Sequence, residues 1–355
     1  MQACVKTALG KTEIMDLPIP EPGPGEIVIK TSMATICGSD MHFLDELPNE
    51  ALAGPFPTVV KEYGLPMGHE GVGYVHSVGE GIKSFKEGDR VMSSCLTACG
   101  KCNECMNGDF GTCTALSMFG SPLFGCQAEY YVVRDAETSV AHIPEGVSDE
   151  NALLATDIMS AGFSGIERED AQIGDSVAIF AQGPLGLCTL VCARLRGCGL
   201  VIAVDTIPER LEVSKKLGAN VVINASEKDP VAEIMALTGN RGVDIGVEAV
   251  GTQPTFEAAA KVTRTGGVVS SIGIYSRIPT LNIPTLTTSF MHRTIVTTMC
   301  PAGRDRMEHL LALLQHSEVD LAPLFTHRMK ISETPAGYDL FRSREDGVLK
   351  VALVP

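Results

Sequence analysis

Residues 175–205 read DSVAIFAQGPLGLCTLVCARLRGCGLVIAVD, and this stretch predicts the fold of the middle of the chain. The apolar run 175–180 has the composition of a buried strand, a glycine-containing turn follows it, and residues 187–196 have the composition of a helix. A second apolar run, 201–204, ends at the acid Asp205. A strand, a glycine turn, a helix, a second strand and a terminal acid are typical of a dinucleotide-binding βαβ unit.

The turn departs from the pattern G-x-G-x-x-G because Ala181 stands at its first position. Asp205 follows Gly186 by nineteen residues, where a carboxylate can bind both ribose hydroxyls of NAD and repel the 2′-phosphate of NADP. A solvated aspartate at a strand end is the competing interpretation of Asp205. The residues expected to contact the cofactor are Gln182, Gly183, Pro184, Leu185, Gly186, Asp205, Thr206, Arg210, Val250, Ile272, Gly273 and Ile274.

Three further stretches, 217–223, 243–248 and 267–273, each combine an apolar run with glycine or polar residues. Repeated alternation of strand and helix predicts a doubly wound parallel sheet of the Rossmann type. Ligands bind at the carboxyl ends of such strands, so the loops after Val250 and Ile272 should face the cofactor.

A second informative stretch is Gly68-His69-Glu70-Gly71-Val72-Gly73, with Cys37 before it and Asp157 after it. An imidazole, a thiolate and a carboxylate leave the fourth position of a tetrahedral zinc open, as in a catalytic site. Cys37 alone would be interpreted as a small buried apolar residue. Asp157 alone would be interpreted as a surface or capping aspartate of the apolar helix expected at 152–159. Together with His69, they favour a metal site.

Four cysteines, Cys99, Cys102, Cys105 and Cys113, follow the spacing C-x2-C-x2-C-x7-C. Four thiolates this close can enclose one zinc in a closed, structural site. An iron–sulfur cluster is the competing interpretation, and the absence of a following proline and of a second cysteine run disfavours it. Cys95 and Cys126 lie outside the spacing and are interpreted as ordinary cysteines.

The N-terminal part has the pattern of a β-rich domain. Residues 1–35 alternate apolar and polar positions between prolines, and 72–78 alternate in the same way, which predicts short antiparallel strands in a barrel-like fold. Residues 46–66 are expected to form an irregular loop that lines the substrate pocket. The tail carries an amphipathic helix at 307–314 and a strand at 349–353, and is expected to return to the first domain.

The composition limits the classes of protein to consider. The 355 residues are enough for two domains, and they include 45% hydrophobic and 20% charged residues. The net charge of −15 argues against a nucleic-acid partner. No run of about 18 apolar residues occurs, so no membrane span is expected. The N-terminus lacks the apolar core of a signal peptide, and the crowding of four cysteines indicates metal in a reducing compartment, so we expect a cytoplasmic location.

The motifs resemble those of the zinc-dependent medium-chain alcohol dehydrogenases over essentially the whole chain. The matching stretches are 37–40, 68–73, the four-cysteine lobe and 183–186. The stretches 156–163 and 300–304 are most similar to the bacterial secondary-alcohol dehydrogenase branch. In that branch the third zinc ligand is an aspartate, which the resemblance assigns to Asp157.

The resemblance implies a GroES-like catalytic domain at residues 1–155, with its zinc lobe at about 95–115. It implies an NAD-binding Rossmann domain at 156–298 and a return of residues 299–355 to the catalytic domain. A homodimer or homotetramer is the usual assembly of the family. Glu70 would lie beside the metal as a neighbouring group or an occasional ligand.

The cofactor expected from the resemblance is NAD. Members of the branch that use NADP carry a small residue and a basic residue after the second strand. Asp205, Thr206 and Ile207 stand there in this chain. Some relatives in the branch also lack the cysteine lobe, which is complete here.

The expected reaction is hydride transfer between NAD and an alcohol/ketone or aldehyde pair, with a secondary alcohol as the expected substrate. The Ser39 hydroxyl can pass the released proton onward, and His42 can complete the relay because histidine titrates near neutrality. A surface histidine is the competing interpretation of His42.

Two alternatives share these motifs. A polyol, amino-alcohol or aldehyde dehydrogenase of the same superfamily would carry nearly all of them, although polyol enzymes more often place a glutamate at the third ligand position. A non-catalytic NAD- and zinc-binding sensor is the alternative from another class, and the intact set of Cys37, Ser39, His69 and Asp157 disfavours it.

Overall fold

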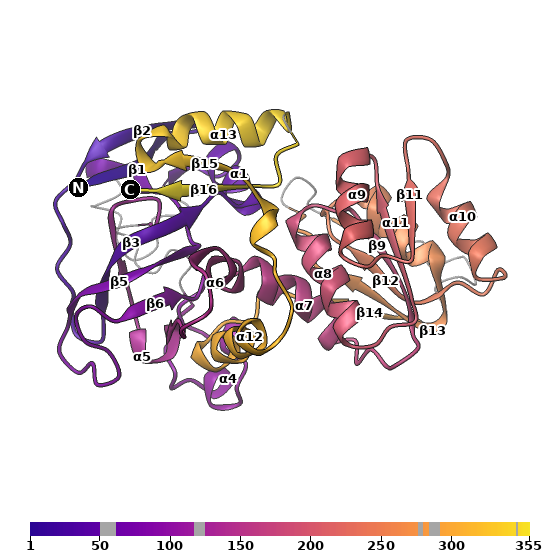
Figure 1. Cartoon of the computed structure of the whole chain (residues 1–355), viewed down its shortest axis with the longest axis horizontal. Coiled ribbons are helices and arrows are strands. Elements are labelled where there is room, and N and C mark those ends of the chain that lie inside the picture. The colour runs from indigo at the N-terminus through magenta and orange to yellow at the C-terminus, as the bar shows by residue number, and fades with distance from the viewer. Residues whose placement is uncertain (50–61, 117–124, 276–279, 284–291, 346) are drawn as a thin grey trace. The chain divides into compact units, whose positions relative to one another are not determined.

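The computed structural model describes residues 1–49, 62–116, 125–275, 280–283, 292–345 and 347–355. The chain forms two compact units (Figure 1). Unit 1 contains Met1–Ser160 and Cys300–Pro355, and unit 2 contains Ala161–Met299. Most of the loop expected at 46–66 falls within residues 50–61 and lies outside the described residues.

Unit 2 contains a six-stranded parallel sheet with the order β11-β10-β9-β12-β13-β14. Its strands are β9 (Ser176–Phe180), β10 (Leu200–Asp205), β11 (Val221–Asn224), β12 (Val243–Glu248), β13 (Thr263–Ser271) and β14 (Thr294–Thr297). The chain starts in the middle of the sheet and winds outward in both directions, which is the Rossmann order. The predicted doubly wound parallel sheet is confirmed.

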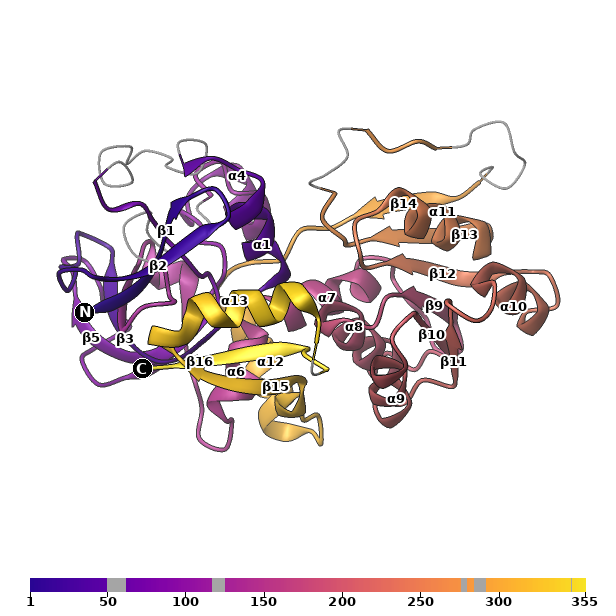
Figure 2. The same cartoon turned by 90° about the horizontal axis from the view of Figure 1, so that it is seen from above.

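Helices cover both faces of this sheet (Figure 2). Helices α8 (Pro184–Leu195) and α9 (Pro208–Lys216) lie on one side, and α10 (Pro230–Leu237) and α11 (Gln253–Val262) lie on the other. Each helix has a proline in its first turn, where an N–H would have no partner within the helix. Side chains such as Ile202, Ile234 and Ala259 join strands and helices in one buried cluster.

The turn between β9 and α8 contains one residue with a positive φ and one position where only glycine fits. Ala181 has φ +83°, in the left-handed region, which costs a residue with a Cβ about 1–2 kcal/mol. Gly186 is required for a different reason, because a Cβ there would lie 1.9 Å from the carbonyl oxygen of Ala181. The helix therefore packs against its own turn more closely than any side chain would allow.

Unit 1 contains a seven-stranded sheet and a three-stranded sheet. The larger has the order β15-β16-β3-β5-β6-β8, with β7 paired to β3, and the smaller has the order β2-β1-β4. The strands are β1 (Gln2–Ala8), β2 (Lys11–Asp16), β3 (Ile27–Thr35), β4 (Leu65–Pro66), β5 (Gly71–Val78), β6 (Arg90–Ser93), β7 (Tyr130–Val133), β8 (Val140–His142), β15 (Phe325–Lys330) and β16 (Lys350–Val354). The predicted β-rich fold is confirmed.

The helices of unit 1 connect these strands, and α7 leads from unit 1 into unit 2. They are α1 (Gly38–Asp45), α4 (Asn103–Met106), α5 (Ala136–Ser139), α6 (Asp149–Ala155), α7 (Ile158–Glu167), α12 (Arg304–His316) and α13 (Thr334–Ser343).

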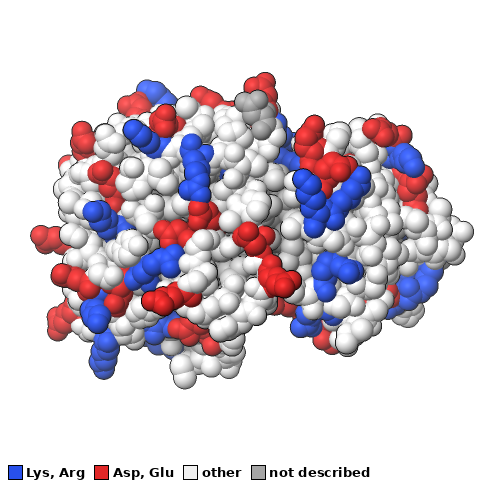
Figure 3. Space-filling view, in the orientation of Figure 1, with Lys and Arg blue, Asp and Glu red and all other residues white. Residues whose placement is uncertain are grey.

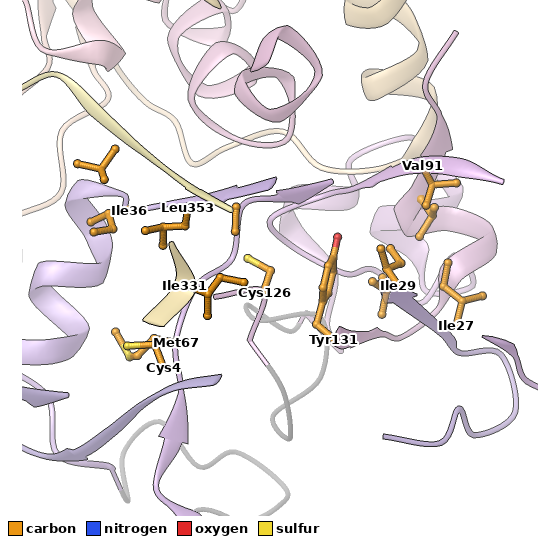
Figure 4. Packing of buried hydrophobic residues seen from close by; sticks show 14 of the residues in the cluster. Cys4, Ile27, Ile29, Ile36, Met67, Val91, Cys126, Tyr131, Ile331 and Leu353 are labelled. Carbon is orange, nitrogen blue, oxygen red and sulfur yellow. The ribbon is translucent and has the colours of Figure 1, made fainter. Parts of the chain in front are cut away.

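The C-terminal tail completes the larger sheet of unit 1. Strand β16 pairs in parallel with β15 and antiparallel with β3, so that Leu353 stands opposite Ala34. Figure 1 shows these yellow strands beside the indigo strands of the N-terminal segment. In Figure 4, Leu353 and Ile331 of the tail pack near Ile36 and Met67 in one buried core. Unit 1 is therefore built from both ends of the sequence.

The structure differs from the sequence analysis around Asp157. The single helix expected at 152–159 is two helices, α6 and α7, with Thr156 and Asp157 in the corner between them. The hydroxyl of Thr156 donates to the carbonyl oxygen of Leu153 at 2.6 Å, a local hydrogen bond that competes with continuation of the helix. The corner presents Asp157 as a turn residue rather than a helix residue.

Charged residues of both signs are interspersed on the face of the molecule shown in Figure 3. Acidic residues outnumber basic ones in the sequence, 43 to 28. No helix in the described part of the chain is both long enough and apolar enough to span a membrane.

Candidate active site

Four potential metal ligands converge in unit 1: Cys37, His69, Glu70 and Asp157. Their donor atoms all lie within 4.8 Å of one another. Nε2 of His69 lies 3.2 Å from Oδ2 of Asp157, and Sγ of Cys37 lies 3.8 Å from the same oxygen. The structure thus brings together the three residues that the sequence analysis selected as zinc ligands, with Glu70 beside them.

Local structure positions each of these donors. Cys37 is the residue that precedes α1, and Asp157 lies in the corner between α6 and α7. His69 follows Gly68, which has φ +95°. A Cβ at Gly68 would lie 2.5 Å from Cγ and 2.8 Å from the backbone nitrogen of Gln127, so only glycine fits there.

Asp40 orients the His69 ring. Oδ1 of Asp40 lies 3.0 Å from Nδ1 of His69, so the other ring nitrogen faces the donor cluster. Oδ2 of Asp40 accepts hydrogen bonds from the Cys37 backbone N–H at 3.0 Å and from the Gln127 side chain at 3.1 Å. Tyr338 donates to Gln127 at 2.8 Å and so extends this buried network. A carboxylate behind a ligating histidine is a common support of metal sites.

Glu70 forms a buried ion pair with Lys350 from β16. Oε2 of Glu70 lies 2.5 Å from Nζ of Lys350, and both residues are essentially inaccessible to solvent. The other oxygen, Oε1, is buried and has no hydrogen-bond partner among the described residues. An orphaned carboxylate oxygen beside three potential ligands is consistent with a cation between them.

Burial and neighbouring charges shift the pKa values of these groups. Burial raises the pKa of the Cys37 thiol, and the negative charge of Glu70 raises it further. Burial raises the pKa of Glu70, and the positive charge of Lys350 only partly offsets this. A divalent cation among these donors would favour the ionised form of each, so the donor set fits a zinc ion.

Neither Asp40 nor Lys350 was selected as a site residue from the sequence. The position of Asp40, three residues after Cys37 in the first turn of a helix, was a usable indication. Lys350 offered none, because it lies 280 residues after Glu70 in a short apolar strand.

The two residues of the expected proton relay both lie on α1. Oγ of buried Ser39 lies 3.2 Å from Nε2 of His69, at the donor cluster. The His42 side chain is 25% exposed, and its Nδ1 lies 3.1 Å from Oε1 of Glu46. Residues three apart share one side of a helix, so these side chains lead from the cluster toward solvent.

The four cysteines of the lobe also converge in unit 1. The Sγ atom of Cys102 lies 3.4 Å from Sγ of Cys105 and 3.9 Å from Sγ of Cys113. The Sγ atoms of Cys113 and Cys99 lie 3.5 Å apart. Backbone N–H groups of Cys105 and Thr114 lower the pKa of Cys102 to about 6, whereas burial raises that of Cys105 to about 12. Four thiols within 4.8 Å of one another can hold one tetrahedral zinc.

In unit 2, Asp205 joins the glycine turn to the end of β10. Its Oδ2 accepts the Gln182 N–H at 2.6 Å, and its Oδ1 accepts the N–H groups of Thr206 and Ile207 at 2.7 and 2.9 Å. A carboxylate offers about four acceptor positions. These three backbone bonds therefore fix Asp205 and leave capacity for a ribose hydroxyl.

The other predicted cofactor residues lie at the same carboxyl ends of the strands. The turn Gln182–Gly186 leads into α8, and Arg210 brings Nη1 to 3.7 Å from the place of a Cβ at Gly183. Ile272 is buried, whereas Val250 and Ile274 are exposed at 42% and 52%.

Glu248 at the end of β12 was missed by the sequence analysis. Its Oε1 accepts the N–H groups of Val250 and Gly251, both at 2.8 Å, and its Oε2 accepts the Tyr275 hydroxyl at 2.8 Å. Glu248 is fully buried. The acid at the end of this strand therefore fixes two of the loops expected to face the cofactor.

Comparison with known proteins agrees with this geometry. The family model of the alcohol dehydrogenase GroES-like domain matches residues 23–145, and that of the zinc-binding dehydrogenases matches residues 184–316. An alcohol dehydrogenase of Cupriavidus necator is 40% identical, over 100% of this chain and 99% of the relative. The NADP-dependent isopropanol dehydrogenase of Thermoanaerobacter brockii is 31% identical, over 92% of each chain.

A solved structure gives the same result. Alcohol dehydrogenase TADH from Thermus sp. ATN1 superimposes with a TM-score of 0.88 at 31% identity, over 100% of this chain and 99% of that one. The likeness therefore includes the GroES-like part, the Rossmann part and the returning tail. The chain belongs to the zinc-dependent medium-chain alcohol dehydrogenases, and it is an alcohol/ketone oxidoreductase that works with zinc and a nicotinamide cofactor.

Proposed function

We propose that this enzyme oxidises a secondary alcohol to a ketone with NAD, at a zinc ion held by Cys37, His69 and Asp157. The observation that carries the proposal is the convergence of these three donors, with Nε2 of His69 facing Asp157 and its other ring nitrogen facing Asp40. Three such ligands leave a position for the alcohol oxygen. We assign unit 1, Met1–Ser160 and Cys300–Pro355, to catalysis and unit 2, Ala161–Met299, to the cofactor.

When bound at these donors, zinc supplies Lewis-acid polarisation of the alcohol oxygen, and the nicotinamide supplies the hydride acceptor. Ser39 is placed to take the alcohol proton, because its hydroxyl lies beside the ring nitrogen of His69 that faces the donors. His42 is placed to pass the proton to solvent from the same helix. Glu70, held by Lys350, keeps a second carboxylate beside the cluster.

We infer NAD rather than NADP from Asp205. Its carboxylate is fixed by three backbone N–H groups at the end of β10, so it cannot turn aside to admit a 2′-phosphate. The relative from Thermoanaerobacter brockii is named for NADP. The cofactor therefore has to be tested by measurement rather than transferred from that relative.

We further infer a structural zinc at Cys99, Cys102, Cys105 and Cys113, and a homodimer or homotetramer. Among the described residues, strand β14 stands at the edge of the six-stranded sheet, with Ile295 exposed at 36%, and Met299 shortly after the strand is exposed at 55%. A sheet edge with exposed apolar residues favours pairing with another chain. The twelve free cysteines fit a reducing cytoplasm.

The first test follows NADH formation by purified, zinc-loaded protein against a panel of primary, secondary, aromatic and polyol alcohols, and repeats each reaction with NADP. Secondary-alcohol turnover with NAD that is lost on chelation would support the proposal. Turnover of polyols alone would show that the substrate is a polyol and not a secondary alcohol. The sorbitol dehydrogenase of Bacillus subtilis, which is 33% identical to this chain, makes polyols the main alternative. No turnover across the panel would favour the sensor.

The second test is the substitution Asp157→Ala. We expect kcat/KM to fall by more than the 10–100-fold that loss of a supporting residue typically costs, because a direct ligand is removed. Asp339→Asn, at a side chain that is 79% exposed, is the matched control and should leave turnover unchanged. Circular dichroism checks the fold of both variants. Turnover by folded Asp157→Ala would remove Asp157 from the ligand set.

A further inference from the structure

Two more thiols lie close to Asp157, outside the set of four donors already described. The Sγ atoms of Cys95 and Cys300 and a carboxylate oxygen of Asp157 all lie within 4.8 Å of one another. Cys95 is 3% exposed and Cys300 is 8% exposed. Cys95, which lies outside the C-x2-C-x2-C-x7-C spacing and was expected to be an ordinary cysteine, is instead part of a donor cluster.

Backbone contacts hold both cysteines at the corner between α6 and α7. The N–H of Cys95 donates to the carbonyl oxygen of Thr156 at 3.1 Å. The Cys300 thiol lies 3.5 Å from the carbonyl oxygens of both Asp157 and Pro301. Two segments distant in the sequence therefore meet at Asp157, and each contributes a sulfur.

We propose that Cys95, Cys300 and Asp157 form a second site for a thiophilic divalent cation, such as excess Zn²⁺ or Cd²⁺, and that this site shares Asp157 with the catalytic site. Two thiolates are soft ligands that suit these ions. They also balance the charge of a dication by themselves, so Asp157 need supply only a bridging oxygen. The two carbonyl oxygens near Cys300 can complete the coordination.

Occupation of this site should inhibit the enzyme. A carboxylate that binds a second cation coordinates the first one differently. Occupation of the second site would therefore change how Asp157 coordinates the catalytic zinc. This inhibitory effect rests on the proposed role of Asp157 at the catalytic zinc. Binding of the additional cation does not rest on that role, so an experiment can contradict the inhibition without contradicting the binding, and the reverse.

The test starts from enzyme with its zinc content measured by elemental analysis, and Cd²⁺ is then added during equilibrium dialysis. We expect one Cd²⁺ to bind per chain without release of zinc, with a new ultraviolet thiolate-to-cadmium absorption and a loss of turnover in proportion to occupancy. The double variant C95S/C300S should keep its zinc and lose this Cd²⁺. C198S, at a buried cysteine of unit 2 outside the donor clusters found among the described residues, should bind Cd²⁺ as the parent does.

Three results would overturn the proposal: no Cd²⁺ uptake by the parent, uptake matched by an equal release of zinc, or undiminished uptake by C95S/C300S. Uptake that leaves turnover unchanged would overturn the shared role of Asp157. If the double variant does not retain zinc, the single variants C95S and C300S replace it. Each single variant should then weaken Cd²⁺ binding at least about tenfold, the lower end for loss of a metal-supporting group.

Discussion

Asp40 determines which nitrogen of His69 faces the donor cluster, although Asp40 itself lies outside that cluster. Asp40→Asn retains the shape of the side chain and removes its charge. We expect zinc affinity to fall about 10–100-fold, because such supporting carboxylates typically contribute that much. Competition with a chromophoric chelator measures the affinity, with Asp339→Asn as the control. Unchanged zinc affinity would contradict the orienting role of Asp40.

The pair Glu70–Lys350 allows a prediction about stability. Lys350→Met leaves a buried carboxylate without its cation, and removal of one partner of a buried ion pair typically costs 3–5 kcal/mol. The double variant Glu70→Gln with Lys350→Met removes both charges and should recover most of that loss. Urea unfolding of zinc-matched samples measures both. Equal stability of the single and double variants would show that the pair is not energetically coupled.

At the scale of single residues, the sequence was sufficient for side chains whose chemistry is specific. A thiolate, an imidazole and an acid beside glycines predicted a common site for Cys37, His69 and Asp157, and the structure brings them together. It was not sufficient for Lys350. A lysine at the start of a short apolar strand is ordinarily interpreted as a surface residue, and the pairing of β16 with β3 places it beside Glu70.

At the scale of secondary structure, strands β9 to β13 and the doubly wound character of the sheet followed from alternation of apolar runs with glycine turns. The sixth strand, β14, was not predicted from the sequence. The break between α6 and α7 did not follow. Residues 152–159 are uniformly good helix formers apart from Thr156 and Asp157, and a local hydrogen bond of Thr156 interrupts them. A helix boundary that depends on one side-chain hydrogen bond cannot be recognised from the composition of the segment.

The connection between α7 and β9 contains an acid with a predictable effect on stability. Glu169 is only 9% exposed, and burial raises its pKa to about 7. The folded state therefore binds more protons than the unfolded state between pH 4.5, the ordinary value, and about 7. Stability must then fall as the pH rises through this range, by about 3 kcal/mol at most.

Glu169→Gln should abolish this dependence and make the protein more stable than the parent at pH 8, where the parent's carboxylate is charged. Denaturant unfolding at a series of pH values measures the difference. Glu318→Gln, at an exposed position, should follow the parent at every pH. If the free energy of unfolding has the same pH dependence in the parent and in Glu169→Gln, burial does not raise the pKa of Glu169.

At the scale of the whole molecule, the cysteine lobe is the part least able to fold alone. Among the described residues, its buried cluster contains Ala98, Cys105 and Cys113, with partly buried Phe110 and Leu116 packed against it. So small a core offsets little of the entropy of ordering the loop, and the structural zinc proposed above would supply the difference. Removal of zinc should therefore unfold the lobe and leave the large sheet of unit 1 in place.

Limited proteolysis after chelation measures this effect. New cleavage is expected between Cys99 and Cys113, and readdition of zinc should suppress it. Cys102→Ser should be cleaved there even with zinc present, whereas Cys4→Ser, at a buried cysteine of β1, should not. Protection of the lobe after complete zinc removal would contradict a structural role for the metal.

The pairing of β16 with β3 has a consequence for the order in which the protein matures. A ribosome releases the N-terminal strands first and the whole of Ala161–Met299 next, and that continuous segment can fold as soon as it emerges. The catalytic unit must wait, because Lys350 can reach Glu70 only after the whole of Ala161–Met299 has been synthesised. During that interval Cys37 and His69 are exposed thiol and imidazole groups on an incomplete sheet. A nascent chain would therefore acquire a competent cofactor domain before it acquires a finished metal centre.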